Sequence, residues 1–215
     1  MANSFKQRKL MLIGGGGHCH SLIDSVIAMN IFDDIGIVDS NSAGFEGVPV
    51  IGADEDIPEL ISSGWNEAFI SVGSIGNTTV RRRLYDLIKR HGLTVPVIAD
   101  PSAIVARDVE IKEGCFIGKN AVVNSGSVIG TGSIINTGVI VEHDCTIGEF
   151  VHVSSGSTLC GQVQIGDDSH IGAGSVVCQL ISIGAYSLIG AGSVVVKDIP
   201  NNVKAYGNPC RVIDK

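Results

Sequence analysis

Residues 115–150 read CFIGKN-AVVNSG-SVIGTG-SIINTG-VIVEHD-CTIGEF, which is six consecutive blocks of six residues. The same division runs without an insertion over residues 103–198, where the third position of all sixteen blocks is Val, Ile or Leu. A helix would scatter these aliphatic residues, because six steps of about 100° turn the chain by roughly 600°. In a strand, positions one and three point to the same side. The repeat therefore predicts a β-helix of short strands, with corners at the frequent glycines of position four.

This six-residue pattern resembles the hexapeptide-repeat proteins. The resemblance implies a left-handed parallel β-helix in which three blocks complete one triangular coil. Sixteen blocks then correspond to just over five coils, with no external loop interrupting them.

The residues before about 100 show no six-residue period and alternate between expected strands and helices. Such alternation predicts a parallel α/β sheet, here half of a Rossmann unit. We expect three parts: a Rossmann-like α/β domain over residues 1–100, an all-β left-handed β-helix over residues 101–200 and a C-terminal tail over residues 201–215. The expected strands are Lys9–Ile13, Ile35–Asp39, Glu67–Val72 and Thr94–Ile98, and the expected helices are Ser21–Met29, Ile57–Ser62 and Thr79–His91.

A glycine run, Gly14 to Gly17, lies between the first expected strand and helix and is followed by His18. Backbone amides at such a turn can bind a phosphate, although a tight structural turn is the alternative. The dinucleotide fingerprint is incomplete, which disfavours NAD. Asp39, at the end of the second strand, can accept a hydrogen bond from a ribose or a base edge, and Gly73 follows the third strand at the edge where ligands bind.

The strongest catalytic candidate is His143, which has Glu142 and Asp144 on either side. A neutral imidazole can accept a proton from an amine or hydroxyl group, and a neighbouring carboxylate fixes its tautomer. A solvated surface histidine is the alternative. Cys145 occupies an inward-pointing position, so a nucleophilic thiol is disfavoured.

Two further histidines, His152 and His170, lie 18 residues apart and should stack in adjacent coils. With His143 they raise the possibility of a zinc site like that of the hexapeptide-repeat carbonic anhydrases. The nine-residue spacing between His143 and His152 does not match that class, so no metal is expected.

Composition excludes other classes of function. The formal net charge is −7, and the longest basic run is Arg81–Arg83, which disfavours nucleic acid and anionic membranes. No stretch reaches the roughly 18 apolar residues of a membrane span, and the polar start does not resemble a signal peptide, so a cytoplasmic protein is expected. Most of the six cysteines should be buried and free: Cys19, Cys115, Cys145, Cys160, Cys178 and Cys210.

The glycine turn, the segment VEHDCTIGEF at residues 141–150 and the GNPC sequence at residues 207–210 together resemble one family of sugar acetyltransferases. Its members are the bacillosamine-type nucleotide-4-amino-sugar N-acetyltransferases and the sialic acid O-acetyltransferases. The resemblance implies His143 as the general base, Asp144 as its acidic neighbour, Asn136 as an active-site amide and the Gly161 amide as the group facing the thioester oxygen. It also implies acetyl-CoA contacts from His152, Gly161, Ala173 and Ala191, and sugar-nucleotide contacts from Gly16, Gly17, His18, Asp39 and Gly73.

The resemblance implies direct acetyl transfer from acetyl-CoA to the 4-amino group of a nucleotide-linked amino sugar, with a UDP-linked 4-amino-6-deoxy sugar favoured. It also implies a homotrimer with active sites at the subunit interfaces. A sialic acid O-acetyltransferase is the alternative within the family, because the same base could activate a hydroxyl group. Two alternatives come from other classes of function: a hexapeptide-repeat carbonic anhydrase and a non-catalytic scaffold.

Overall fold

The computed structural model describes residues 7–45 and 47–213, which form two compact units. The first unit holds the residues up to Gly73 together with Arg83–Pro96, and the second holds Ser74–Arg82 together with the residues from Val97 onward. The short segment Ser74–Arg82 thus belongs with the β-helix although it lies between two parts of the α/β unit in sequence.

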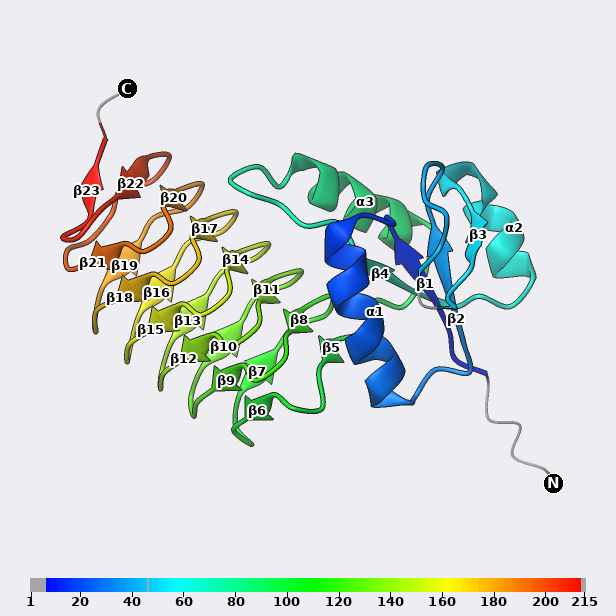
Figure 1. The fold of residues 1–215 in the computed structure, drawn as a ribbon, viewed down its shortest axis with the longest axis horizontal. Coiled ribbons are helices and arrows are strands. Elements are labelled where there is room, and N and C mark those ends of the chain that lie inside the picture. The colour runs from blue at the N-terminus through cyan, green and yellow to red at the C-terminus, as the bar shows by residue number, and fades with distance from the viewer. Residues whose placement is uncertain (1–6, 46, 214–215) are drawn as a thin grey trace. The chain divides into compact units, whose positions relative to one another are not determined.

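The first unit is built on a parallel four-stranded sheet in the order β3-β2-β1-β4 (Figure 1). Its core consists of the aliphatic residues of the central strands, such as Leu10 and Leu12, and of the inner face of the first helix, such as Leu22 and Val26. The strands are β1 (Lys9–Ile13), β2 (Asp34–Val38), β3 (Val50–Gly52) and β4 (Glu67–Ile70). The helices are α1 (Gly17–Met29), η1 (Asp54–Asp56), α2 (Ile57–Ser62) and α3 (Thr79–Arg90), whose first turn belongs to the second unit.

The expected strand Lys9–Ile13 and helix Ile57–Ser62 are confirmed with the same bounds. Helix α1, however, begins at Gly17, four residues before the expected start at Ser21. The end of the glycine run therefore forms the first turn of a helix, so its backbone N–H groups point out of the helix end.

Two expectations in this unit are wrong. Strand β3 (Val50–Gly52) was not expected, and the expected strand Thr94–Ile98 does not form. Thr94 makes only an isolated bridge to Glu67, whereas Ile98 begins a strand of the other unit. Pro96 lies between them and has no N–H for a sheet ladder, which explains the break.

The second unit is a parallel β-helix whose strands are stacked in three sheets (Figure 1). Each strand from Ile98–Ala99 to Val176–Val177 pairs with the strand 18 residues further along the chain, as Ile134 pairs with His152 and His152 with His170. The predicted three-block coil is thus confirmed. The strands are β5 (Ile98–Ala99), β6 (Ile104–Val105), β7 (Glu110–Ile111), β8 (Phe116–Ile117), β9 (Val122–Val123), β10 (Val128–Ile129), β11 (Ile134–Ile135), β12 (Ile140–Val141), β13 (Thr146–Ile147), β14 (His152–Val153), β15 (Thr158–Leu159), β16 (Gln164–Ile165), β17 (His170–Ile171), β18 (Val176–Val177), β19 (Ser182–Ile183), β20 (Leu188–Ile189) and β21 (Val194–Val195).

The third-position aliphatic residues form the core of the β-helix, as the repeat predicts. The first-position serines also point inward, and they are fully buried. Five of these seven hydroxyl groups donate to carbonyl groups 15 residues further along, for example from Ser157 to Gly172 at 3.0 Å, and those of Ser187 and Ser193 donate to other carbonyl groups. Because these polar groups are satisfied, the narrow interior tolerates them.

The corners are at position six, not at the glycines of position four. Residues at position six have a positive φ, for example 72° at Gly126 and 58° at Asp144. The position-four glycines serve another purpose, because a Cβ atom on Gly130 would lie 2.5 Å from the carbonyl carbon of Gly148 in the next coil. The absence of a side chain there allows the coils to approach closely.

The C-terminal segment continues the β-helix. Strand β22 (Lys204–Tyr206) adds to β20 in parallel, and β23 (Arg211–Val212) pairs with β22 in the antiparallel direction. Four of the six cysteines are buried and all six are free. Among the helices of the described residues, none has the length and apolar character needed to cross a membrane.

Candidate functional site

His143 and Asp144 form a hydrogen-bonded pair in the turn after β12. The Nδ1 atom of His143 lies 2.9 Å from Oδ2 of Asp144, and the imidazole side chain is 59% exposed. Because a carboxylate only accepts hydrogen bonds, Nδ1 carries the proton and Nε2 of the neutral ring keeps its lone pair. Asp144 is a position-six corner residue with a left-handed backbone. Nε2 of His143 is therefore an accessible base whose ring is oriented by Asp144.

Gly161 lies one coil beyond His143, directly over its ring. The backbone N–H of Gln162 donates to the His143 carbonyl at 2.9 Å, which ties the two turns together. A Cβ atom on Gly161 would lie 2.5 Å from Nε2 of His143, so any side chain there would displace the ring. Within the described residues, the Gly161 N–H makes no hydrogen bond. The structure therefore brings together a proton acceptor and a backbone amide, two of the expected catalytic groups.

Asn136 and His152 form a second cluster. Nδ2 of Asn136 lies 3.2 Å from Nε2 of His152, and Nδ1 of His152 lies 2.8 Å from the carbonyl oxygen of Ser74. Burial lowers the pKa of His152 to about 4, so the ring is neutral near pH 7. Asn136 precedes strand β12 and His143 follows it, so the two clusters lie at different corners of one coil.

Ala173 and Ala191 occupy equivalent positions in adjacent coils and are both exposed. The N–H of Gly192 donates to the Ala173 carbonyl at 2.8 Å. A Cβ atom on Gly172 would collide with the backbone N of Ala191. The two alanines therefore form a smooth corner without large side chains, at a different corner from the one that holds His143 and Gly161.

Gly16 and Gly17 form the open N-terminal end of α1. A Cβ atom at either position would meet no atom within 4 Å, and neither residue has a positive φ. The fold of this chain therefore does not require glycine at these two positions. Gly14 differs, because its φ is 105° and a Cβ atom there would collide with Val72. Open backbone N–H groups at a helix start suit an anion.

Asp39 ties the glycine turn to the loop after β2. Its carboxylate accepts hydrogen bonds from the backbone N–H groups of Gly15 and Asn41, both at 2.7 Å. These bonds, with that of Gly15 the strongest, hold the pKa of Asp39 below its usual range. The carboxylate thus shapes the turn, a role that the sequence alone did not indicate.

Gly73 lies against His18, since a Cβ atom on Gly73 would be 3.4 Å from the Cβ of His18. The hydroxyl of Ser71 donates to the carbonyl of Gly14 at 2.5 Å and joins the same two loops. All five expected sugar-nucleotide residues therefore gather at the carboxyl ends of β1, β2 and β4, where parallel sheets bind ligands.

The segment Ser74–Arg82 was not expected to contribute to the β-helix. The guanidinium of Arg82 makes two hydrogen bonds of 2.7 Å to the carboxylate of Asp168, and the hydroxyl of Thr78 donates to the same carboxylate. Burial raises the pKa of Asp168, but these hydrogen bonds outweigh it and hold the pKa below its usual value. No repeat or motif marks this segment, so only the folded chain shows the contact.

Arg81 anchors the same segment. Its side chain is almost fully buried, it donates to the carbonyl of Gly132, and its guanidinium lies 5.6 Å from the ring centroid of Phe150. Burial lowers the pKa of Arg81 to about 10. Arg81 and Arg82 therefore attach this segment to the β-helix.

The histidines His152 and His170 stack in adjacent coils, as expected, with their rings edge to face and centroids 5.0 Å apart. Both ring nitrogens of His152 already have protein partners. In the part of the chain that the structure describes, no group of three His, Cys, Asp or Glu side chains is placed to hold a metal ion.

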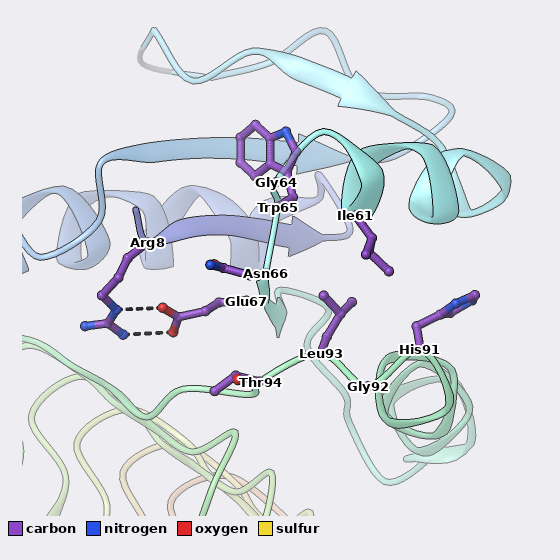
Figure 2. A pocket seen from close by; sticks show the side chains of 10 residues that line it. All are labelled: Arg8, Ile61, Gly64, Trp65, Asn66, Glu67, His91, Gly92, Leu93 and Thr94. Atoms are coloured by element: carbon purple, nitrogen blue, oxygen red, sulfur yellow. Dashed lines mark hydrogen bonds and ion pairs between the residues drawn. The ribbon is translucent and has the colours of Figure 1, made fainter. Parts of the chain in front are cut away.

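A cavity of about 560 Å³ lies at the other end of the first unit's sheet, where β1 and β4 begin. Figure 2 shows the guanidinium of Arg8 facing the carboxylate of Glu67, with hydrogen bonds of 2.6 and 2.8 Å between them, and His91 and Leu93 on the opposite wall. The charges of Arg8 and Glu67 neutralise each other. The cavity also lies away from the carboxyl ends of the strands, where parallel sheets bind ligands. We do not assign it to the functional site.

Comparison with known proteins identifies both units. Residues 9–88 match the PglD N-terminal domain, residues 144–179 match the bacterial transferase hexapeptide, and residues 109–143 and 162–197 match the hexapeptide repeat of succinyl-transferase. A variant of perosamine N-acetyltransferase from Caulobacter crescentus, bound to CoA and GDP-perosamine, is 34% identical with a TM-score of 0.91, over 96% of this chain and 97% of that one.

Two further solved structures are each similar over 96% of this chain. The acetyltransferase domain of PglB from Neisseria gonorrhoeae, in complex with acetyl coenzyme A, is 34% identical with a TM-score of 0.91 and is covered completely. WeeI from Acinetobacter baumannii is 25% identical with a TM-score of 0.86 and is also covered completely.

Proposed function

Because this chain belongs to the hexapeptide-repeat sugar acetyltransferases with a PglD-type N-terminal domain, and is an acyltransferase with a left-handed β-helix, we propose that it N-acetylates a nucleotide-linked amino sugar. Acetyl-CoA is the proposed donor and the 4-amino group of a UDP-linked 4-amino-6-deoxy sugar the proposed acceptor. The Caulobacter enzyme, bound to CoA and GDP-perosamine, supports a nucleotide amino sugar as the acceptor. The Neisseria domain, bound to acetyl coenzyme A, supports the donor.

One observation carries the proposal: Nε2 of His143 lies directly beneath the Gly161 backbone. A base beside a backbone amide donor is what acyl transfer to an amine needs. The acceptor nitrogen would approach Nε2 while the thioester oxygen approaches the Gly161 N–H.

In the proposed reaction, the amine lone pair forms a bond to the thioester carbonyl carbon. His143 takes the proton that the nitrogen loses, Asp144 stabilises the resulting imidazolium, and the Gly161 N–H donates to the tetrahedral oxyanion. The C–S bond then breaks, and the CoA sulfur leaves with that proton as the thiol. The products are the N-acetyl sugar and CoA.

An acyl-enzyme through Cys145 is not part of this proposal. The thiol is buried, its Sγ atom lies 3.2 Å from the Cys160 carbonyl oxygen, and burial raises its pKa. A neutral, enclosed thiol is a poor nucleophile.

In the proposed division of labour, the first unit binds the nucleotide and the β-helix binds acetyl-CoA. The uncovered N–H groups at Gly16 and Gly17 suit the diphosphate. Asp39, which binds the Gly15 N–H, and Gly73, which lies against His18, are their neighbours. The contacts of His152, Ala173 and Ala191 with acetyl-CoA remain predictions.

We also propose that the protein acts as a homotrimer. The outer face of the sheet that contains β12 carries a row of aliphatic residues, of which Ile104 is 65% and Ile140 is 37% exposed. Asn136 lies at one border of this face and His143 at the other. Packing of this face against a second copy would bury the row and bring the His143 corner of one copy towards the Asn136 corner of another.

Release of free thiol from acetyl-CoA by the purified protein tests the function. UDP-linked and GDP-linked 4-amino-6-deoxy sugars and sialic acid should be offered in parallel, with His143→Ala as the control. Turnover on a nucleotide amino sugar that the variant loses supports the proposal. Turnover with sialic acid alone would identify an O-acetyltransferase, and a preference for the GDP-linked sugar would overturn the UDP assignment.

A further inference from the structure

A continuous chain of hydrogen bonds runs from the backbone of Ser74 through His152 to the amide of Asn136. Its links are Ser74 O to His152 Nδ1 at 2.8 Å, His152 Nε2 to Asn136 Nδ2 at 3.2 Å, and Asn136 Oδ1 to the Thr137 N–H at 2.8 Å. His152 is 9% exposed, so the two bonds that its ring makes are largely shielded from water.

The partners determine the direction of every bond in this chain. The Thr137 N–H can only donate, so the atom of Asn136 that faces it is the oxygen and its NH₂ group faces His152. Nε2 of His152 must then accept, and Nδ1 must carry the proton that it donates to the Ser74 carbonyl. A protonated ring would place two donors opposite each other at Asn136, so the arrangement requires a neutral His152.

Ser74 directly follows Gly73, which ends the first unit and is one of the residues proposed to bind the nucleotide. The rest of its segment is held to the β-helix by the contacts of Thr78, Arg81 and Arg82 described above. Ser74 is thus the first residue after Gly73 whose backbone is hydrogen-bonded to a strand residue of the β-helix, His152. Gly73 and Ser74 are joined by one peptide bond, and the Ser74 carbonyl is the group that His152 contacts.

We propose that His152 is a positioning residue that couples nucleotide binding at the turn of Gly73 to the orientation of the Asn136 amide in the acetyl-transfer site. One hydrogen of the Asn136 NH₂ group is used by His152, and the second is left to donate to a bound ligand. When a nucleotide sugar orders the Gly73 turn, the Ser74 carbonyl holds the His152 ring and the ring holds the amide in its binding orientation. This proposal rests on the proposed function, since it assumes that the two units bind the two substrates.

Two substitutions separate the two bonds of His152. In His152→Asn, the side-chain NH₂ replaces Nδ1 and keeps the bond to Ser74 but loses the acceptor for Asn136. In His152→Gln, the side-chain oxygen replaces Nε2 and keeps the bond to Asn136 but loses the link to Ser74. His170→Gln is the matched control, because it removes a buried imidazole from the next coil without touching either bond.

The coupling is measured as the ratio of CoA dissociation constants without and with saturating UDP or GDP, by titration calorimetry. In the unaltered protein we expect CoA to bind about fivefold or more tightly with one of these nucleotides present. Both His152 variants should reduce this ratio to near one, whatever the change in the affinity for CoA alone, because the ratio compares each variant with itself. His170→Gln should keep the ratio of the unaltered protein.

Coupling that persists in both His152 variants, or that disappears equally in His170→Gln, would overturn the proposal, as would the absence of coupling in the unaltered protein. The measurement does not use acetyl transfer. Coupling without turnover on any amino sugar would therefore refute the proposed reaction and leave the role of His152 standing, whereas turnover without coupling would do the reverse.

Discussion

The Gly161 backbone lies over the ring of His143, close enough that a single methyl group on Gly161 would sit 2.5 Å from Nε2. Stacking of equivalent positions in successive coils of the β-helix produces this contact. It places the backbone of Gly161 next to the Nε2 atom of His143. The arrangement makes Gly161 a sensitive position for function and a tolerant one for folding.

Gly161→Ala should reduce kcat by about 10² to 10³-fold, because the methyl group displaces the base and crowds the amide donor. The melting temperature should change little, since the clash is with the far end of an exposed side chain. Thiol-release kinetics and a thermal melt on the same preparation check both statements. Activity near that of the unaltered protein would contradict the assigned geometry.

Asp144→Asn should reduce kcat by about 10 to 100-fold, as part of the roughly 10² to 10⁴-fold contribution of a general base. The amide keeps the size of the side chain and tolerates the left-handed backbone at this corner, where φ is 58°. The folded state is therefore preserved while the negative charge that orients Nδ1–H is lost. A variant with unchanged kcat and an unchanged pH profile would show that Asp144 does not act on His143.

Gly17→Ala should leave the protein folded and raise the KM for the nucleotide sugar, with little effect on the KM for acetyl-CoA. A methyl group there would meet no protein atom within 4 Å, and Gly17 has no positive φ that would require glycine. The only space it occupies is that proposed for the diphosphate. Kinetics with each substrate varied in turn supply the measurement, and equal effects on the two KM values would argue against the assignment.

The free energy of unfolding should fall as the pH drops from about 6.5 towards 4, because of His152. The unfolded histidine takes up a proton near pH 6.5 but the folded one only near pH 4, so between these values the unfolded state binds more protons. The limiting loss is about 3 kcal/mol. Burial also lowers the pKa of His170, which adds to the loss in the same direction.

Denaturant unfolding at pH 7.5 and pH 5 measures this effect, and His152→Gln should make the difference between the two pH values smaller. Replacement of the exposed His143 by Gln is the control. If the two variants showed the same pH dependence, the burial of His152 would not be its source.

Arg82→Leu should destabilise the protein by about 3 kcal/mol, because it leaves the carboxylate of Asp168, whose side chain is 1% exposed, without its cation. The double variant Arg82→Leu/Asp168→Asn should recover part of that loss, since a neutral amide is cheaper to bury. Denaturant unfolding of the two single variants and the double variant gives the interaction energy. Strict additivity would mean that the two residues do not stabilise the fold as a pair.

The repeat predicted the β-helix and its core well, because the third-position aliphatic residues and the first-position small residues allow no other consistent burial. The prediction of corners at position four was wrong, because the chain turns at position six. Gly130 at position four is required by the approach of Gly148 in the next coil, and that distance exists only once the coils are stacked. The left-handed residues at position six include Asp144 and Phe150, which no composition rule marks.

In the first unit, the order of elements predicted the sheet, and the glycine turn and Asp39 were placed at its ligand-binding edge. The engagement of Asp39 by backbone N–H groups could not be predicted, because it depends on how the loop after β2 folds back. The same holds for β3, a strand of three residues that is stabilised by its neighbour and not by its own pattern.

The sequence by itself determined the repeat register, and with it the stacking of His143 beneath Gly161 and of His152 beside His170, since both follow from an 18-residue coil. Only the tertiary structure decided that Ser74–Arg82 is bound to the β-helix and that His152 faces the Ser74 carbonyl. A repeat specifies neighbours at a fixed separation in the chain. Contacts such as Ser74 with His152 or Arg82 with Asp168 join segments that share no period, so they form only when the whole chain has folded.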